Sequence, residues 1–230
     1  MKYRTKYYLT WALLVALVGF GVGALIALRA NRTFSKEQRM IIRQSDSVMY
    51  VTVWPEDIVI LRTPCADLTR AELKSKDLKT LMAKMLATVR APKHDGVGIA
   101  APQVGISKRI ICLQRFDKDG GPFECYLNVH IDSLFGEIGK GPEGCLSIPP
   151  MRGLVPRYTD IIVSYIHPET LELKRDTVTG YTAVIFQHEC DHLDGILYID
   201  RADTVYASPS WEAERRAYDY ARPEWWPLLP

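Results

Sequence analysis

Residues 187–195 read QHECDHLDG, and the HExxH pattern within them places His188 and His192 four residues apart. On a helix this spacing brings both imidazoles onto one face, where they can bind the same metal ion. Glu189, beside the first histidine, is a candidate general base for a metal-bound water. The preceding residues, 183–186, read AVIF and predict that the helix is buried. Because buried ionisable groups need partners, we interpret this helix as the metal-binding helix of a hydrolase rather than as a surface helix.

A third metal ligand is expected from a segment upstream. Residues 143–147 read EGCLS within a stretch rich in glycine and proline, which predicts an irregular loop. A loop cysteine of this kind is usually a small buried apolar residue. Beside two histidines, however, Cys145 becomes a candidate ligand, and a Cys/His/His set leaves a fourth position for water. Such a set accommodates Fe(II) or Zn(II).

Residues 96–103 read GVGIAAPQ, a run without charge. A phosphate-binding GxGxxG loop would need a glycine where Ala101 stands. We interpret the run as an extended segment whose backbone pairs with a peptide. Gln103, polar in apolar surroundings, is a candidate donor to an oxyanion. The alternative is that the segment packs under the sheet and that Gln103 is bonded to the backbone.

The order of elements predicts an α+β fold, with mostly antiparallel β-sheets around the central buried helix that carries the HExxH motif. A capping box at 69–72 and apolar spacing behind it predict an amphipathic helix. The helices are expected at 70–90 and 182–194, with a surface helix from residue 203 onward. Strands are expected at 109–114, 124–129, 161–167 and 171–178, and an irregular stretch at 139–157.

Residues 9–28 carry no charge and are long enough to cross a bilayer as a helix. We predict an uncleaved transmembrane anchor behind a basic tail at 1–8, with a cleaved signal peptide as the alternative. Basic residues beyond the run slightly outnumber those before it, which favours a cytoplasmic catalytic domain but leaves the extracytoplasmic side open. The predicted continuation is a spacer at 29–54, a catalytic domain at 55–203 and a C-terminal extension at 204–230.

The composition excludes little. The chain has 230 residues and a formal net charge of +2, so its charge gives no reason to expect binding to nucleic acid. Its five cysteines are odd in number and follow no repeating spacing, which predicts reduced thiols rather than a disulfide framework.

Taken together, GVGIAAPQ, EGCLS and QHECDH resemble, complete and in order, the three signature motifs of the peptide deformylases. The resemblance covers residues 55–203. It implies a hydrolase that removes the N-formyl group from the formyl-methionine of nascent or free peptides. It also implies that one Fe(II) ion, for which Zn(II), Ni(II) or Co(II) can substitute, is held by Cys145, His188 and His192.

The resemblance assigns roles to further residues. Glu189 would act as general base and then protonate the leaving amine, while the Gln103 side chain and the Leu146 backbone N–H would stabilise the oxyanion. Glu143 matches the family's acidic residue before the cysteine. The positions implied for peptide backbone pairing or the methionine pocket are Val97, Gly98, Ile99, Arg152, Tyr181, Val184 and Ile185.

The ends of the chain depart from the family. A membrane-spanning segment precedes the domain, and the aromatic tail does not resemble the basic helix of some bacterial members, so ribosome docking is not implied. We expect a monomeric catalytic domain.

Two other functions match part of the pattern. A membrane-anchored HExxH metalloprotease would place its third ligand downstream, where no histidine follows Gly195. A formyl-peptide binding module without turnover would have no need of Glu189 and Gln103.

Overall fold

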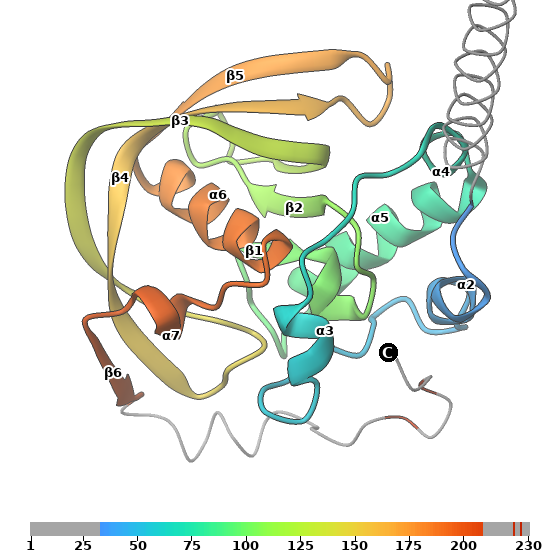
Figure 1. Cartoon of the computed structure of the whole chain (residues 1–230), viewed down its shortest axis with the longest axis horizontal. Helices are drawn as coiled ribbons and strands as arrows, with labels where there is room; N and C mark the ends of the chain where they lie inside the picture. Colours follow the sequence, from blue (N-terminus) through green and yellow to red (C-terminus); the bar gives the residue numbers. More distant parts are fainter. Residues whose placement is uncertain (1–32, 209–222, 224–225, 227–230) are drawn as a thin grey trace, which may run out of the picture.

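The computed structural model describes residues 33–208 together with residues 223 and 226 (Figure 1). The predicted membrane anchor at 9–28, the tail at 1–8 and most of the C-terminal extension lie outside the described residues. Among the helices that are described, none combines the length and the apolar composition that a membrane crossing requires.

Six strands form one antiparallel sheet within the described part of the chain, which confirms the predicted α+β class. The sheet follows the order β1 to β5, and β6 pairs with β4. The strands are β1 (Gly98–Ala100), β2 (Ile110–Gln114), β3 (Phe123–Gly144), β4 (Met151–Ile166), β5 (Leu173–Thr179) and β6 (Thr204–Ala207). The helices are α2 (Lys36–Ile42), α3 (Ile58–Arg62), α4 (Arg70–Leu73), α5 (Lys76–Val89), the 3-10 helix η1 (Ala101–Val104), α6 (Gly180–Leu193) and α7 (Tyr198–Arg201).

Helix α6 carries the HExxH motif and lies inside the curve of the long β3–β4 pair, against β1, β2 and β4 (Figure 1). Ten of its fourteen residues are buried, including Phe186 and Leu193 in the core and the polar Glu189 and His192. The helix starts two residues before the predicted boundary. Gly195 follows it at a φ of +73°, and a Cβ there would stand 2.4 Å from the Arg62 carbonyl oxygen, so the sharp exit requires glycine.

Three predicted elements are wrong because pairing or capping overrides local sequence signals. The irregular stretch at 139–157 belongs largely to β3 and β4, which pair on both sides of the loop at Cys145 despite their glycines and prolines. The helix at 70–90 is two helices, because Ser75 accepts a hydrogen bond from the Leu78 N–H and starts a new one. The surface helix expected in the tail from residue 203 onward is wrong for residues 204–207, which form β6 and pair with β4, whereas residues 209–222 lie outside the described part of the chain.

The predicted spacer at 29–54 is wrong for its described part. Ser35 forms a capping box that starts α2, and Phe34, Ile41 and Ile42 are buried in the core cluster that also contains helix α5. Burying these side chains removes apolar surface from water, so the folded domain begins before Pro55.

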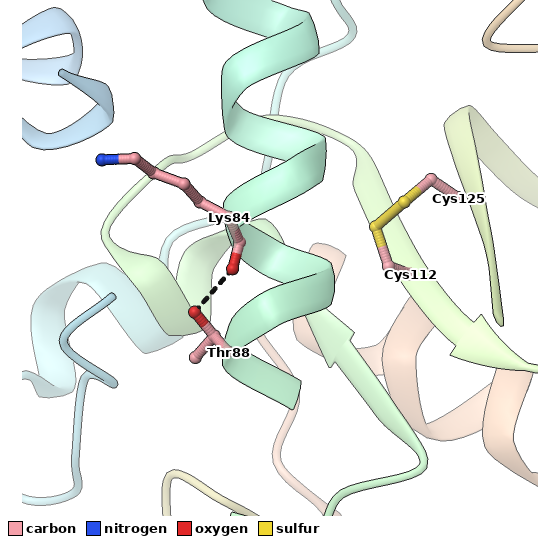
Figure 2. Close-up of a disulfide and its surroundings, with 4 residues drawn as sticks. All are labelled: Lys84, Thr88, Cys112 and Cys125. Carbon is pink, nitrogen blue, oxygen red and sulfur yellow. Dashed lines mark hydrogen bonds between the residues drawn. A yellow bond between two sulfur atoms is a disulfide. The ribbon is translucent and has the colours of Figure 1, made fainter. Parts of the chain in front are cut away.

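The prediction of reduced thiols holds for Cys65, Cys145 and Cys190 and is wrong for the other two cysteines. Cys112 on β2 and Cys125 on β3 form a disulfide, with Cα atoms 4.0 Å apart (Figure 2). They are direct partners in the antiparallel register. Counting cysteines missed this bridge because strand register, rather than sequence spacing, places the two residues opposite each other.

Candidate metal centre and its cleft

Three potential metal ligands converge from two elements. Cys145 follows β3, and His188 and His192 project from α6, so that one ligand atom of each lies within 4.8 Å of the others. The Cys145 Sγ is 3.2 Å from His192 Nε2. A tetrahedral ion with bonds of roughly 2.0–2.3 Å separates its ligands by a similar amount, about 3.5 Å. The donor set and its spacing therefore fit one divalent transition-metal ion.

A buried ion-pair network sets the orientation of His188. Its Nδ1 lies 2.8 Å from Glu143 Oε2, which leaves Nε2 to face the other two ligands. Arg157 donates to both oxygens of Glu143, at 2.7 and 3.0 Å. Burial alone would raise the pKa of Glu143, but the hydrogen bonds from His188 and Arg157 lower it to about 2. Glu143 is therefore a carboxylate that fixes the tautomer of His188.

His192 is available as a neutral ligand. Burial and the neighbouring charge of His188 lower the pKa of His192 well below its usual value. Its Nδ1 is buried without a hydrogen-bond partner. The imidazole thus keeps a free lone pair on Nε2, the atom that faces Cys145.

Glu189 faces the same centre. Its side chain is buried, and its Oε2 has no hydrogen-bond partner. Burial raises the pKa of Glu189 to about 7, which makes it a group able both to accept and to release a proton near neutrality. A Cβ at Gly98 would lie 2.3 Å from Glu189 Oε1, so the close approach of β1 to this carboxyl requires glycine.

Gln103 presents its amide N–H groups to the centre. Its Oε1 accepts from the Ala100 N–H at 2.8 Å, which directs Nε2 towards Cys145 Sγ at 3.4 Å and Ser147 Oγ at 3.2 Å. The extended segment ends at Ala100, and Gln103 lies in η1. The two predicted alternatives are therefore combined, because one end of the amide is bonded to backbone and the other end faces the centre.

A cavity of about 350 Å³ opens beside these groups. It is lined by most of the residues that the sequence assigned to substrate or catalysis: Val97, Gly98, Gln103, Glu143, Cys145, Leu146, Arg152, Tyr181, Val184, Ile185, His188 and Glu189. Ile99 is not among them. Its side chain is buried in the core, and only its backbone belongs to the strand beside the cavity. His192 also lies behind the lining, as a donor atom of the ligand cluster.

Sequence reasoning missed two groups of residues. His94 and Asp95 line the cavity from the turn before β1, and Asp95 has a φ of +44°. Their position directly before the GVGIAAPQ run could have suggested them. Arg157 belongs to no motif. It is paired with Gly139 in the β3–β4 register, and only the structure shows that its guanidinium reaches Glu143 farther along β3.

Comparisons with known proteins point to the same family as the three sequence motifs. The polypeptide deformylase family model matches residues 48–207. The peptide deformylase of Leptospira biflexa is 38% identical over 149 residues, which span 62% of this chain and 82% of the relative. Peptide deformylase 1 of Nitrosomonas europaea is 41% identical over 128 residues, or 53% of this chain and 71% of the relative.

Solved structures of peptide deformylases have folds similar to that of this chain. The actinonin-bound class I type b peptide deformylase of Acinetobacter baumannii is 38% identical, with a TM-score of 0.60 over 68% of this chain and 99% of that one. The enzyme from Thermotoga maritima is 34% identical, with a TM-score of 0.60 over the same shares. The same Acinetobacter enzyme has also been solved with Met-Ala-Ser bound.

Proposed function

The chain belongs to the peptide deformylase family, and from that premise we propose that it hydrolyses the formamide of N-formylmethionyl peptides, releasing formate and a free amino terminus. One observation carries the proposal. Cys145, His188, Glu189 and Gln103 line one cavity, and His192 completes the ligand cluster behind that lining.

We propose Cys145 Sγ and the Nε2 atoms of His188 and His192 as the ligands of one divalent cation. Fe(II) is the ion that the family resemblance implies, with Zn(II), Ni(II) or Co(II) as substitutes. When bound, such an ion lowers the pKa of a water molecule and polarises the formyl oxygen. The protein's part is to hold three ligands in place, with Glu143 fixing the orientation of His188.

Glu189 carries the proton in the proposed reaction. Its carboxylate accepts a proton from the attacking water as the new C–O bond forms at the formyl carbon. It then donates that proton to the methionine nitrogen as the C–N bond breaks, so the amine leaves neutral and formic acid forms. The remaining proton of formic acid passes to solvent, and the product is released as formate. The raised pKa of Glu189, about 7, suits both steps.

We propose two hydrogen-bond donors for the negative charge that develops on the formyl oxygen. The Gln103 Nε2 is directed at the centre by the bond between its Oε1 and the Ala100 N–H. The backbone N–H of Leu146 is proposed as the second donor, next to Cys145. Both act on charge that is larger in the transition state than in the substrate, which is the condition for a faster chemical step.

The peptide is proposed to bind along β1. This strand stands at one end of the sheet path and pairs with β2 on one side. A substrate backbone would pair with residues 97–99 by β-augmentation. The methionine side chain would occupy the apolar part of the cavity near Val97, Leu146, Val184 and Ile185, with Arg152 and Tyr181 at its border.

We also propose, from the sequence alone, that residues 9–28 anchor the chain in a membrane as an uncleaved helix. Detergent or alkaline carbonate extraction of the full chain from membranes tests this. Release by carbonate without detergent would contradict it.

Formate release tests the activity. Protein comprising residues 30–230, loaded with Ni(II) or Fe(II), should release formate from formyl-Met-Ala-Ser, and Glu189→Ala should abolish that release. An HExxH protease would instead cleave internal bonds of unformylated peptides, and a binding module would bind the formyl peptide without releasing formate. Absence of formate, or activity that survives Glu189→Ala, would contradict the proposal.

A further inference from the structure

Helix η1, which carries Gln103, is too short to hold its own geometry. It spans four residues, and a single 3-10 turn is only marginally stable in isolation. The orientation of Gln103 must therefore come from what surrounds η1.

Thr52 bonds to η1 from outside. Its backbone N–H donates to the Gln103 carbonyl at 2.8 Å, and its Oγ1 donates to the Pro102 carbonyl at 3.1 Å. Thr52 is fully buried, so neither bond competes with water. These contacts fix the main chain from which the Gln103 side chain projects.

Residues 52–54 also contact the loop that carries the second proposed oxyanion donor, the Leu146 N–H. The Trp54 N–H donates to the Ser147 carbonyl at 2.8 Å. Ser147 in turn accepts from Gln103 Nε2 at 3.2 Å. Residues 52–54 thus connect η1 to the loop that contains Leu146.

Trp226, in the C-terminal extension, lies against the residue that ends η1. Gly105 ends η1 with a φ of +79°, and a Cβ there would lie 2.4 Å from the Trp226 ring. Trp226 is buried in the core cluster that contains Ile41 of α2, and its ring meets Tyr50 edge-on with centroids 4.8 Å apart. Trp226 and α2 both lie outside the residues that match the family model.

We propose that Thr52 and Trp226 are positioning residues for Gln103: Thr52, inside the deformylase core, and Trp226, beyond it, both contact η1 and set the direction of the Gln103 amide. This rests on the proposed function, because Gln103 matters to rate only if it stabilises an oxyanion. It makes Trp226, a residue beyond the family core, part of the catalytic apparatus.

Matched threonine variants of the full chain test the proposal. Thr52→Val removes the hydroxyl at constant shape, and Thr52→Ser restores it. Thr88→Val is the control, because the Thr88 hydroxyl is also buried and donates to the Lys84 carbonyl at 2.7 Å (Figure 2). It accepts from the Met49 N–H at 2.8 Å, so its hydrogen bonds go to residues other than those of η1. Trp226→Ala and Trp226→Phe form the corresponding aromatic pair.

The measurements are kcat and KM for formyl-Met-Ala-Ser, bound metal and thermal midpoint. Thr52→Val and Trp226→Ala should lower kcat by roughly 10-fold or more with KM and metal content unchanged, because a misdirected donor weakens only transition-state binding. Thr52→Ser and Trp226→Phe should recover most of the loss, and Thr88→Val should lose stability without losing kcat. Equal kcat in Thr52→Val and Thr88→Val overturns the positioning role while leaving the deformylase proposal intact, whereas an inactive wild type overturns both.

A second inference rests on the Cys112–Cys125 disulfide, which is independent of η1. Disulfides persist in oxidising compartments and are reduced in the cytosol. The bridge joins direct partners on two adjacent core strands. Two of the remaining thiols, Cys65 and Cys190, are free and buried.

We infer that the catalytic domain matures on the oxidising side of the membrane, opposite to the orientation that the flanking charges slightly favour. If the proposed activity holds, its substrates there are free formyl-peptides rather than chains emerging from ribosomes.

Thiol labelling of cells that carry the full chain tests this inference. Cells are quenched in acid and alkylated without reduction, and the peptides with Cys112 and Cys125 are then examined by mass spectrometry. The expected result is no label on either cysteine until a reductant is added, together with digestion of the domain by protease added to intact cells. Labelling without reduction, or a domain that is protected until lysis, overturns the inference, while formate release by the purified protein separately decides the activity.

Discussion

Arg157 and Glu143 form a buried two-point ion pair, Nε to Oε1 at 2.7 Å and the second guanidinium nitrogen to Oε2 at 3.0 Å. The same guanidinium donates to Asp191 at 2.6 Å. Glu143 then reaches the ligand His188. Arg157 therefore contacts the carboxylate that orients a metal ligand, without contacting the ligand itself.

Arg157→Lys should weaken metal binding by about 10- to 100-fold, because lysine keeps the charge but loses the planar fork that holds both Glu143 oxygens. Competition with a chelator, using Co(II) or Ni(II), measures the affinity. The control is Arg201→Lys, since Arg201 also bonds Asp191, at 2.7 Å through each of two nitrogens, without contacting Glu143. Equal metal affinity in the two variants would show that the ion pair does not orient the ligand.

Gln103→Glu should lower kcat by roughly 10²- to 10³-fold with little change in KM, because it replaces an oxyanion donor by an acceptor of the same shape. Steady-state formate release measures both constants. Ser147→Ala removes the hydroxyl that accepts from Gln103 Nε2 and should cost far less, since the amide keeps its bond to Ala100. A Gln103→Glu enzyme with wild-type kcat would remove this residue from the mechanism.

Local sequence patterns predicted the reactive residues of this site better than the strands, disulfide and ion pair that surround them. Helix α6 was predictable because its two histidines have helical spacing and the contiguous apolar run before them indicates burial. The Cys145 loop was predictable because its motif is short and contiguous. The length of β3 and β4, the Cys112–Cys125 pair and the Arg157–Glu143 contact were not. Each depends on strand register, which is set by packing between residues distant in sequence. The burial of Phe34, Ile41 and Ile42 was missed for a different reason, because the polar composition of residues 29–54 hides a few apolar side chains that pack into the core.

Replacing both Cys112 and Cys125 by alanine should destabilise the domain by on the order of 3 kcal/mol, the entropy expected from opening a loop of this size. Urea unfolding with and without reductant measures the difference. Reductant should destabilise the wild type and leave the double variant unchanged. Cys65→Ala controls for the loss of a buried cysteine without a bridge, and a reductant effect of equal size on wild type and double variant would contradict the prediction.

Stability should fall in acid, below the ordinary pKa of an aspartate, as the Asp117–Arg115 pair is lost. The hydrogen bonds from Arg115 lower the pKa of Asp117, so this carboxylate contributes stability above its ordinary pKa and loses it as the pH falls through its lowered value. Urea unfolding at pH 6 and pH 3 measures the change. Asp117→Asn should be less stable than wild type at pH 6 and closer to it at pH 3. A constant difference between the two proteins would exclude the linkage.

Gly98→Ala should reduce kcat by about 10²-fold or more, because the added Cβ would stand 2.3 Å from Glu189 Oε1 and must displace the proton-carrying carboxyl. Bound metal should be unchanged, since the three ligand residues are untouched. Gly139→Ala is the matched control, as a Cβ at that position meets no atom within 4 Å.

The double variant Gly98→Ala with Glu189→Ala separates displacement of the carboxyl from a general effect on β1. If Gly98→Ala acts by displacing Glu189, the double variant should be no slower than Glu189→Ala alone, because the displaced group is already absent. A further loss in the double variant would mean that the added methyl disturbs peptide pairing along β1, and KM for formyl-Met-Ala-Ser would then rise as well.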